Sequence, residues 1–270
     1  MKHIKAFFLF IQSAIKHRFV IQQLVKRDFQ NKYLASYIGL PWVFIQPAIL
    51  IAVMWFAFSF GLKIQVMDGG VPFVFWLICG MIPWMFLSDA LNFTTHSLVE
   101  FSYLIKKTSF NMGIIPFIKI FTALIIHIAF LFLLMIISIG YGYYPTVYWF
   151  QIIYYLFASF ILITGLGWLV SALTVFIRDI GQVVMAVISI LFWATPIIWP
   201  FSKLGEDLEW IALFNPFFYL IEGYRYTFID QVWFFESLEM NIYFWSFTSV
   251  IFIAGATVFR KLKGHFADVL

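Results

Sequence analysis

The sequence predicts an all-α integral membrane protein with six transmembrane helices, an N-terminal amphipathic helix in the membrane interface, and short re-entrant or outer helices between spans five and six. Two observations carry this prediction. Of the 270 residues, 63% are hydrophobic and only 11% are charged, whereas soluble domains carry about 25% charged residues. Several uncharged runs also exceed the roughly 20 apolar residues that a helix needs to cross a bilayer. The longest of them, 120–177, has no Asp, Glu, Lys or Arg in 58 residues.

The first 32 residues are predicted to form a cytoplasmic amphipathic helix. A secretory signal peptide fits this stretch poorly, because Lys16, His17 and Arg18 interrupt the apolar run and no small-residue cleavage site follows. Farther along, Ile21 and its apolar neighbours at helical spacing oppose glutamines and basic residues. A basic amphipathic helix lies in the membrane interface rather than across the bilayer. This helix is a lipid anchor or, as the alternative, also contacts a cytoplasmic partner.

Spans one and two are predicted at about 38–62 and 71–94. Prolines near the start of span one indicate a kink or a late helix start. Span two contains Asp89, whose charge is costly in lipid unless partners or water satisfy it. A polar segment, 95–119, follows span two, and its charges make it unsuited to the bilayer centre.

The uncharged run 120–177 is long enough to fold back on itself as two spans. Its natural break is GYGYYP at 140–145, which has two glycines, a proline and tyrosines that suit the membrane interface. Span three is therefore predicted at about 120–139 and span four at about 148–177.

Arg178 and Asp179 follow span four directly and predict a tight cytoplasmic turn before span five, at about 180–199. In lipid this charged pair would be expensive. At the rim of the membrane it forms a solvated turn or, as the alternative, a docking point for a partner protein.

The segment 201–239 is apolar in part, but charges and Asn-Pro and Glu-Gly pairs interrupt it. It is too broken for a clean span, so short re-entrant or interface-lying helices fit better. The final span is predicted at about 240–259, and three basic residues follow it.

The distribution of basic residues predicts the orientation. Six spans put both termini on one side, and placing them in the cytoplasm puts 14 of the 17 Lys and Arg residues inside. Orientation follows this bias. The prediction is a single multi-pass domain, 1–270, in the cytoplasmic (inner) membrane with both termini cytoplasmic. Its parts are an amphipathic helix at 1–32, a six-span bundle at 33–264 and a cytoplasmic tail at 265–270.

The sequence lacks the common signatures of catalysis and metal binding. It has no GxxxxGK[ST] or GxSxG stretch, its five histidines show no HExxH spacing, and Cys79 is its single cysteine. Asp89 and His96, seven residues apart, share a helix face either as a proton relay or catalytic pair or as plain polar contacts between helices. We interpret the chain as a conduit rather than an enzyme, with no metal site and no nucleic-acid partner.

Six stretches of the sequence, in order and together covering most of the chain, resemble one family. They are RDFQNKYLASYIGLPWVFIQP (27–47), GMIPWMFLSDAL (80–91), SYLIKKTSF (102–110), GLGWLVSALTVFIRDI (165–180), TPIIWP (195–200) and NPFFYLIEGYR (215–225). The family is the membrane (permease) subunit of type-2 ABC exporters for polysaccharides, which comprises O-antigen, capsule and teichoic-acid permeases. One departure is that Asn111 follows Phe110, where the family commonly has Phe-Pro, and the proline comes at Pro116.

The resemblance implies a homodimer of this chain bound to two copies of a separate cytoplasmic ABC ATPase. ATP and Mg would bind to that ATPase, and no cofactor is expected on this chain. The ATPase contacts would be the N-terminal helix, the 96–110 segment as a coupling helix and the turn after span four. The implied coupling residues are Arg27, Asp28, Glu100, Tyr103, Lys106, Lys107, Arg178 and Asp179. Lys106 and Lys107 have an alternative role as positive-inside anchors.

The resemblance also implies a path for a lipid-linked polysaccharide. Sugar rings present apolar faces and polar edges, which suit aromatic side chains with a polar tip. The path candidates are Trp42, Trp84, Trp193, Trp199, Phe217 and Tyr224, and the outer-gate candidates are Asn215, Pro216, Glu222 and Arg225. Glu222 and Arg225 stand three residues apart, so a helix would pair them on one face, as part of an exit gate or as a simple interfacial ion pair.

O-antigen is the favoured cargo. The alternatives are a capsule or teichoic-acid polymer, or a non-sugar cargo such as a drug or a lipid. A third reading, from another class, is an intramembrane enzyme that acts on lipid-linked sugars through Asp89 or His96.

Overall fold

The computed structural model describes residues 18–34, 39–64, 66–107, 111–201 and 214–270. Within these residues the chain is helical, and its only β-type pairing is an isolated bridge between Val66 and Pro72. The all-α prediction is therefore confirmed. The first part of the predicted amphipathic helix, 1–17, lies outside the described residues.

Five helical segments are long and apolar enough to cross a membrane, at 40–61, 73–100, 112–140, 147–176 and 238–269. They contain α3 (Leu40–Phe56, continued by η2, Ala57–Gly61), α4 (Phe73–Glu100), α6 (Ile115–Gly140, after η4, Met112–Ile114), α7 (Ile152–Phe176, after η5, Val147–Gln151) and α11 (Leu238–Leu262). These segments correspond to predicted spans one, two, three, four and six.

Predicted span five corresponds to α8 (Ile180–Ala194), which ends earlier than expected. Its 15 residues make a helix of about 22 Å, against a hydrocarbon core of roughly 30 Å. The prediction extended this span to residue 199, but Thr195 is already extended, with φ −92° and ψ 137°. Thr195 precedes Pro196, and the proline ring disfavours helical geometry in the residue before it.

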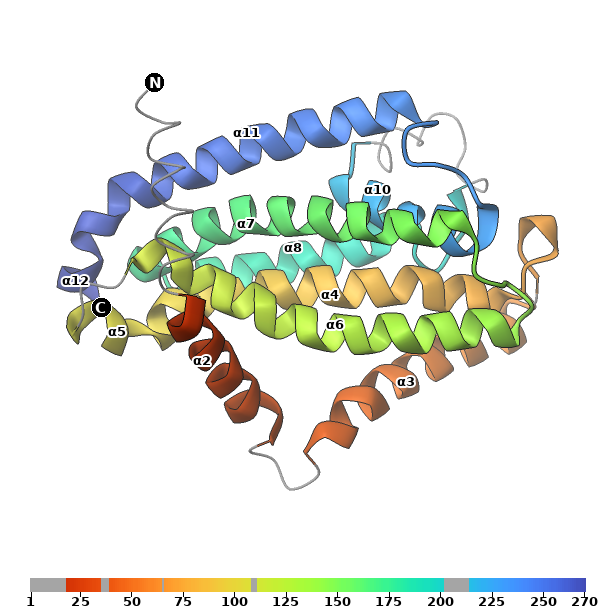
Figure 1. Cartoon of the computed structure of the whole chain (residues 1–270), viewed down its shortest axis with the longest axis horizontal. Helices are drawn as coiled ribbons and strands as arrows, with labels where there is room; N and C mark the ends of the chain where they lie inside the picture. The colour runs from red at the N-terminus through yellow and green to blue at the C-terminus, as the bar shows by residue number, and fades with distance from the viewer. Residues whose placement is uncertain (1–17, 35–38, 65, 108–110, 202–213) are drawn as a thin grey trace.

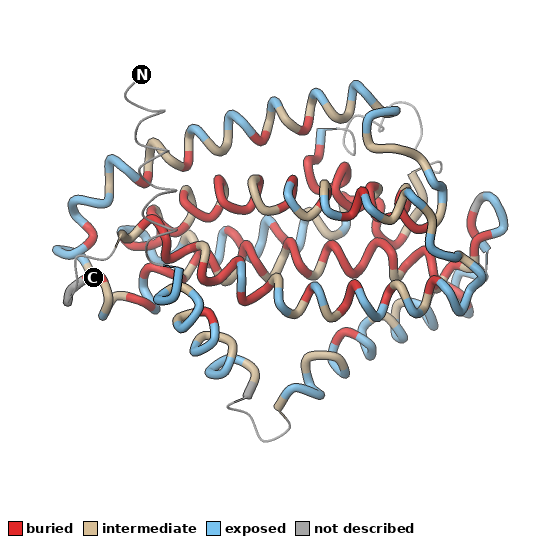
Figure 2. The backbone as a smooth tube through the Cα atoms, viewed as in Figure 1, coloured by how far each residue is buried: buried red, intermediate tan, exposed pale blue. Residues whose placement is uncertain are grey.

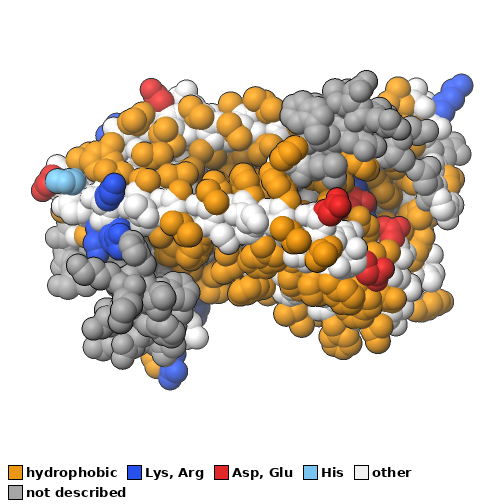
Figure 3. Space-filling view, turned by 90° about the horizontal axis from the view of Figure 1, so that it is seen from above, with side chains coloured by type: hydrophobic (Ala, Val, Ile, Leu, Met, Phe, Trp, Pro, Cys, Tyr) orange, Lys and Arg blue, Asp and Glu red, His pale blue; other side chains and the backbone are white. Residues whose placement is uncertain are grey.

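Short helices lie at both ends of the bundle (Figure 1). One end carries α2 (Arg18–Phe29, continued by η1, Gln30–Leu34), α5 (Ser102–Lys107) and α12 (Phe266–Val269, after η9, Lys263–His265). The opposite end carries η3 (Asp68–Gly70), α10 (Pro216–Arg225) and η8 (Tyr226–Asp230). We call the first the basic end, because most blue side chains in Figure 3 gather near α12, whereas a group of red ones lies at the opposite end. The orientation of the two ends in the membrane stays a prediction.

The central helix of the bundle is α4, which packs against α3, α6, α7, α8 and α10. In its most apolar stretch 72% of the residues are buried, against 11% in the α3 segment. Figure 2 shows the same contrast between the red α4 and the largely pale α3. Helix α4 therefore contacts helices at both ends of the molecule, α5 at one and α10 at the other.

Two glycines let α7 and α11 cross closely. A Cβ on Gly255 of α11 would lie 2.1 Å from the carbonyl oxygen of Gly165 on α7. Such small residues allow helix backbones to approach in membranes, where lipid supplies no hydrophobic drive for association. This crossing holds α11, in which most residues are exposed or half-buried, onto α7.

The polar segment predicted at 95–119 is shorter in the structure. Helix α4 continues to Glu100, and α6 already begins at Ile115. The hydroxyls of Thr94 and Thr95 donate to carbonyl oxygens one turn back, at 2.8 and 2.7 Å, so these polar residues remain in the helix. The predicted boundaries of spans two and three were therefore wrong by several residues.

At the basic end, a separate cluster of buried apolar side chains connects α2 with α4, α6 and α7. Val25 of α2 is buried in it with Leu98, Ile118 and Trp168, and Ile21 and Leu24 pack against it. The side chains of Gln22, Gln23, Lys26 and Arg27 are exposed. The predicted amphipathic division of this helix is therefore present in α2.

Candidate functional site

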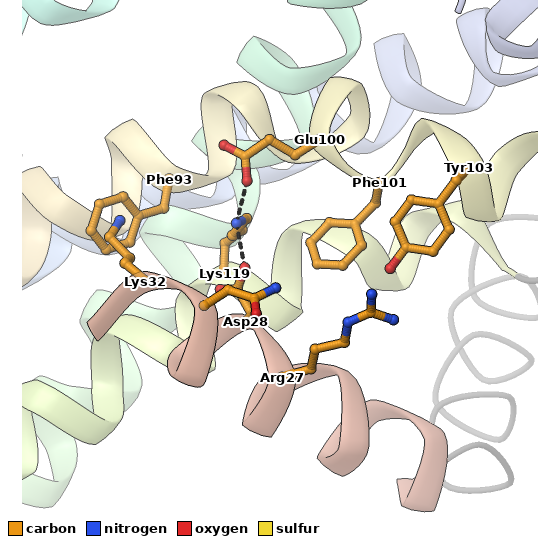
Figure 4. Close-up of a pocket in the computed structure, with 9 residues that line it drawn as sticks. Arg27, Asp28, Lys32, Phe93, Glu100, Phe101, Tyr103 and Lys119 are labelled. Atoms are coloured by element: carbon orange, nitrogen blue, oxygen red, sulfur yellow. Dashed lines mark hydrogen bonds and ion pairs between the residues drawn. The ribbon is translucent and has the colours of Figure 1, made fainter. Parts of the chain in front are cut away.

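A pocket of about 360 Å³ lies at the basic end between α2, the last turns of α4, α5 and the first turn of α6 (Figure 4). Its lining residues are Arg27, Asp28, Asn31, Lys32, Phe93, Glu100, Phe101, Tyr103 and Lys119. Four of the eight predicted coupling residues belong to this set, namely Arg27, Asp28, Glu100 and Tyr103. The structure therefore brings together segments that are far apart in the sequence.

Lys119 is the residue that ties these segments to one another. Its Nζ lies 2.5 Å from Oδ1 of Asp28 on α2 and also donates a hydrogen bond to Oε2 of Glu100 at the end of α4. The side chains of Lys119 and Asp28 are 6% and 10% exposed, whereas Glu100 is 52% exposed. Removing one member of such a buried ion pair leaves an uncompensated charge, which is strongly destabilising.

Local sequence explains the position of each member. Asp28 follows Val25 by three residues, so it stands on the face of α2 that packs against the bundle. Lys119 stands among the buried Ile118 and Ile120 of α6. Lys119 was missed as a functional candidate because the sequence places it in a polar segment. The available signal was a lysine four residues into a strongly apolar helix.

Lys32 of η1, which continues α2, forms a second connection to α4. Its Nζ lies over the ring of Phe93 on α4. The pKa of Lys32 is lowered from 10.5 to about 8, mainly because partial desolvation disfavours its charged form although the residue keeps contact with solvent, while nearby Asp89 opposes this shift. Lys32 is thus the cation close to the intramembrane carboxylate of Asp89.

Asp89 and His96 do not form a catalytic pair in this structure. Asp89 lies close enough to Lys32 for the carboxylate to raise the pKa of that lysine, whereas the ring of His96 lies against Gly181, where a Cβ would be 2.5 Å from its Cε1. The two side chains therefore have different neighbours. Among the described residues, no group of three or more His, Cys, Asp or Glu side chains is arranged to hold a metal ion.

The other predicted coupling residues lie away from this pocket. Arg178 and Asp179 are exposed in the turn between α7 and α8, at the basic end (Figure 1). Lys106 and Lys107 belong to α5, but their side chains are outside the described residues.

The predicted outer-gate residues gather around α10 at the opposite end. Oδ1 of Asn215 accepts from the backbone N–H of Phe217 and caps the helix, which Pro216 begins. Nη1 of Arg225 lies 2.9 Å from Oε2 of Glu222, as predicted from their spacing. The i,i+3 pairing is therefore confirmed, and the gate role stays a prediction.

The predicted path aromatics divide into two groups. Trp84, Phe217 and Tyr224 are buried: the ring centroid of Trp84 lies 6.0 Å from that of Phe217, and the hydroxyl of Tyr224 lies 2.6 Å from Nε2 of His127. Trp42 and Trp193 are exposed, and Trp199 is half-buried and donates to the carbonyl of Trp193. The path assignment itself stays a prediction for both groups.

The sequence matches known proteins over most of its length. Residues 20–229 match the family model described as ABC-2 type transporter. Two proteins named O-antigen export system permease protein RfbA, both from Klebsiella pneumoniae, are 26% and 24% identical to this chain, each over 92% of it and 93% of the relative. A protein of the same name from Myxococcus xanthus is 23% identical, over 96% of this chain and 98% of the relative. The chain is therefore a multi-pass membrane protein that belongs to the ABC-2 type transporter family.

Proposed function

We propose that this chain is the transmembrane subunit of an ATP-driven exporter that moves a lipid-linked polysaccharide, O-antigen, across the cytoplasmic membrane. The observation that carries the proposal is the similarity, over 92–96% of the chain, to proteins that are named O-antigen export permeases. The arrangement of the helices supports it, because the predicted coupling and gate residues occupy opposite ends of one bundle (Figure 1).

The working unit is a homodimer of this chain with two copies of a cytoplasmic ABC ATPase. Membership of the ABC-2 family supports the ATPase partner, and the sequence has no GxxxxGK[ST] loop of its own. ATP and Mg bind to the ATPase. The basic end faces the cytoplasm, in keeping with the bias of lysine and arginine toward that side.

The basic end receives the ATPase through α2, α5 and the Arg178–Asp179 turn. A displacement of α2 reaches α4 and α6 through the ion cluster of Asp28, Lys119 and Glu100. Because α4 contacts most other helices, the displacement continues to α10 at the opposite end. Shifts of packed helices between two arrangements are a common form of such coupling.

The polymer leaves past α10, where the predicted gate residues meet the buried aromatics. Trp84 and Phe217 present aromatic faces that suit the apolar faces of sugar rings. The geometry gives the Asp89–His96 enzyme alternative no support, because His96 lies against Gly181 whereas Asp89 lies near Lys32.

The proposal is tested by co-expressing the tagged chain with the ATPase encoded beside it and comparing wild type with Arg178→Glu. We expect a stoichiometric complex for the wild type, release of the ATPase by the charge reversal, and loss of O-antigen from the cell surface. Lys63→Glu is the matched control, because Lys63 lies at the opposite end and is also exposed. If no ATPase co-purifies with the wild type, or O-antigen display persists without this chain, the proposal is wrong.

A further inference from the structure

A fully buried arginine lies at the opposite end of the bundle. The Arg225 side chain is 1% exposed. Its Nη1 donates to the carbonyl oxygen of Pro196 at 2.7 Å and to Glu222 at 2.9 Å, and its Nη2 donates to the carbonyl oxygen of Ile197 at 3.1 Å. Its Cζ lies 3.5 Å from the ring centroid of Trp76 on α4. Desolvated cation–π contacts of this kind are stronger than exposed ones.

Helix α4 forms one side of the site that the Arg225 guanidinium occupies, which we call its seat. A Cβ on Gly80 would lie 2.7 Å from Nη2 of Arg225, so any larger residue there would force the guanidinium to shift. Trp76, Gly80 and Trp84 are spaced by four residues and share one face of α4. Phe217 at the start of α10 meets Trp84, and Arg225 at its end meets Trp76. Helix α10 therefore lies antiparallel along this face.

The segment after α8 is held against α10 at both ends of that helix. Nδ2 of Asn215 donates to Oγ1 of Thr195 at 2.6 Å, while Arg225 binds the carbonyl groups of Pro196 and Ile197. A single guanidinium therefore joins three separate parts of the chain, namely α4, α10 and 195–197. Separating any one of them from the others breaks contacts of Arg225.

We propose that Arg225, Trp76 and Gly80 form a latch that holds this end of the exporter closed, and that the guanidinium leaves Trp76 when the polymer passes. This proposal rests on the proposed export function. Glu222 explains why the latch is reversible: it belongs to the same helix as Arg225 and is 17% exposed, so the ion pair moves with α10 and the charge stays neutralised when the seat is empty. The contacts to α4 and to 195–197 break together, which gives two discrete states.

The native cysteine reports the state of the latch. Cys79 is the only cysteine of the chain, is 0% exposed and stands beside Gly80 on α4. A membrane-impermeant maleimide, added to spheroplasts that contain the complete exporter, should label Cys79 slowly in the wild type. Gly80→Ala displaces the guanidinium without harming helix propensity. We expect it to speed labelling about 30-fold, the shift that loss of one desolvated cation–π contact produces in a two-state opening.

Matched variants separate the latch from general damage. Gly140→Ala is the control, because a Cβ there meets nothing within 4 Å, and Cys79→Ala gives the unlabelled background. Trp76→Phe keeps an aromatic ring but weakens the cation–π contact, so we expect its labelling rate to lie between those of the wild type and Gly80→Ala. If Gly80→Ala fails to accumulate in the membrane, Trp76→Phe alone tests the latch.

Labelling and export report different failures. Wild-type labelling rates in both Gly80→Ala and Trp76→Phe, at normal membrane levels, would overturn the latch while leaving export intact. Absence of O-antigen export by the wild type would overturn the proposed function, whatever the labelling rates.

Discussion

The two ends of the bundle each hold a cation between helices, but its partners differ. Lys119 at the basic end lies between two carboxylates, one of them the half-exposed Glu100, and borders an open pocket. Arg225 at the opposite end is enclosed by backbone carbonyl groups and an indole ring. A carboxylate near water exchanges partners readily, whereas a sealed guanidinium either keeps all its contacts or loses them together. The basic end is therefore suited to receive a movement and the opposite end to resist one until it opens.

The largest expected effect comes from Lys119→Met, which removes the ammonium group that binds both Asp28 and Glu100. Breaking a buried ion pair in this way costs about 3–5 kcal/mol. We expect a lower unfolding temperature of the purified chain in detergent and loss of export. Lys261→Met, which removes an exposed lysine at the same end, should leave both unchanged.

A double variant tests whether the unpaired charge is the cause. Asp28→Asn combined with Lys119→Met removes the buried carboxylate as well, so we expect it to recover part of the stability lost in the single variant. Equal unfolding temperatures for the single and double variants would contradict the central role of the ion cluster at the basic end.

Much of the fold follows from where the charges stand in the sequence. Uncharged stretches place the spans because charges are costly in lipid, and the distribution of lysine and arginine separates the two ends. The Glu222–Arg225 pair was also predictable, since residues three apart on a helix are neighbours. The helical segments differ from the predictions mainly at their boundaries, where hydroxyl groups continue α4 and a proline ends α8.

The partners of the two buried cations could not be predicted in this way. Lys119 and Asp28 are separated by 91 positions in the sequence, and their contact depends on how α2 packs against α6. Likewise, no local pattern indicates that Arg225 lies over Trp76. Such pairings depend on how the apolar faces of the helices pack, because this packing determines which polar side chains meet.

A moderate effect is expected from Arg225→Met, which sharpens the comparison between the two cations. This variant leaves the carboxylate of Glu222 and two backbone carbonyl groups without their donor, whereas Lys119→Met leaves two carboxylates without theirs. We expect a stability loss of at least about 1–3 kcal/mol, the usual cost of one buried hydrogen-bonding group left unpaired. The unfolding temperature in detergent measures it, beside that of Lys119→Met.

Glu222→Gln is the paired control for this prediction, because it removes the ion pair but keeps the carbonyl and indole contacts of Arg225. Its stability should therefore lie between the wild type and Arg225→Met. If Glu222→Gln loses more stability than Arg225→Met, the contacts of Arg225 with α4 and 195–197 contribute less to stability than its ion pair with Glu222. The two ends of the bundle would then differ less than the comparison above requires.

The smallest expected effect is a pH dependence at the basic end, carried by Lys32. Its pKa of about 8 lies below the ordinary value of 10.5, because desolvation and the charge of Lys119 oppose protonation more than Asp89 favours it. Between these two values the unfolded chain binds a proton that the folded chain does not, so the wild type gains stability as the pH rises through this window, while below it the penalty is constant. Lys32→Met should abolish this gain. The test is to measure the unfolding temperatures of the wild type and Lys32→Met between pH 8 and pH 10.5. If the two temperatures change in parallel with pH, the pKa of Lys32 is the same in the folded and the unfolded chain. The contact with Phe93 would then leave the ammonium group in water.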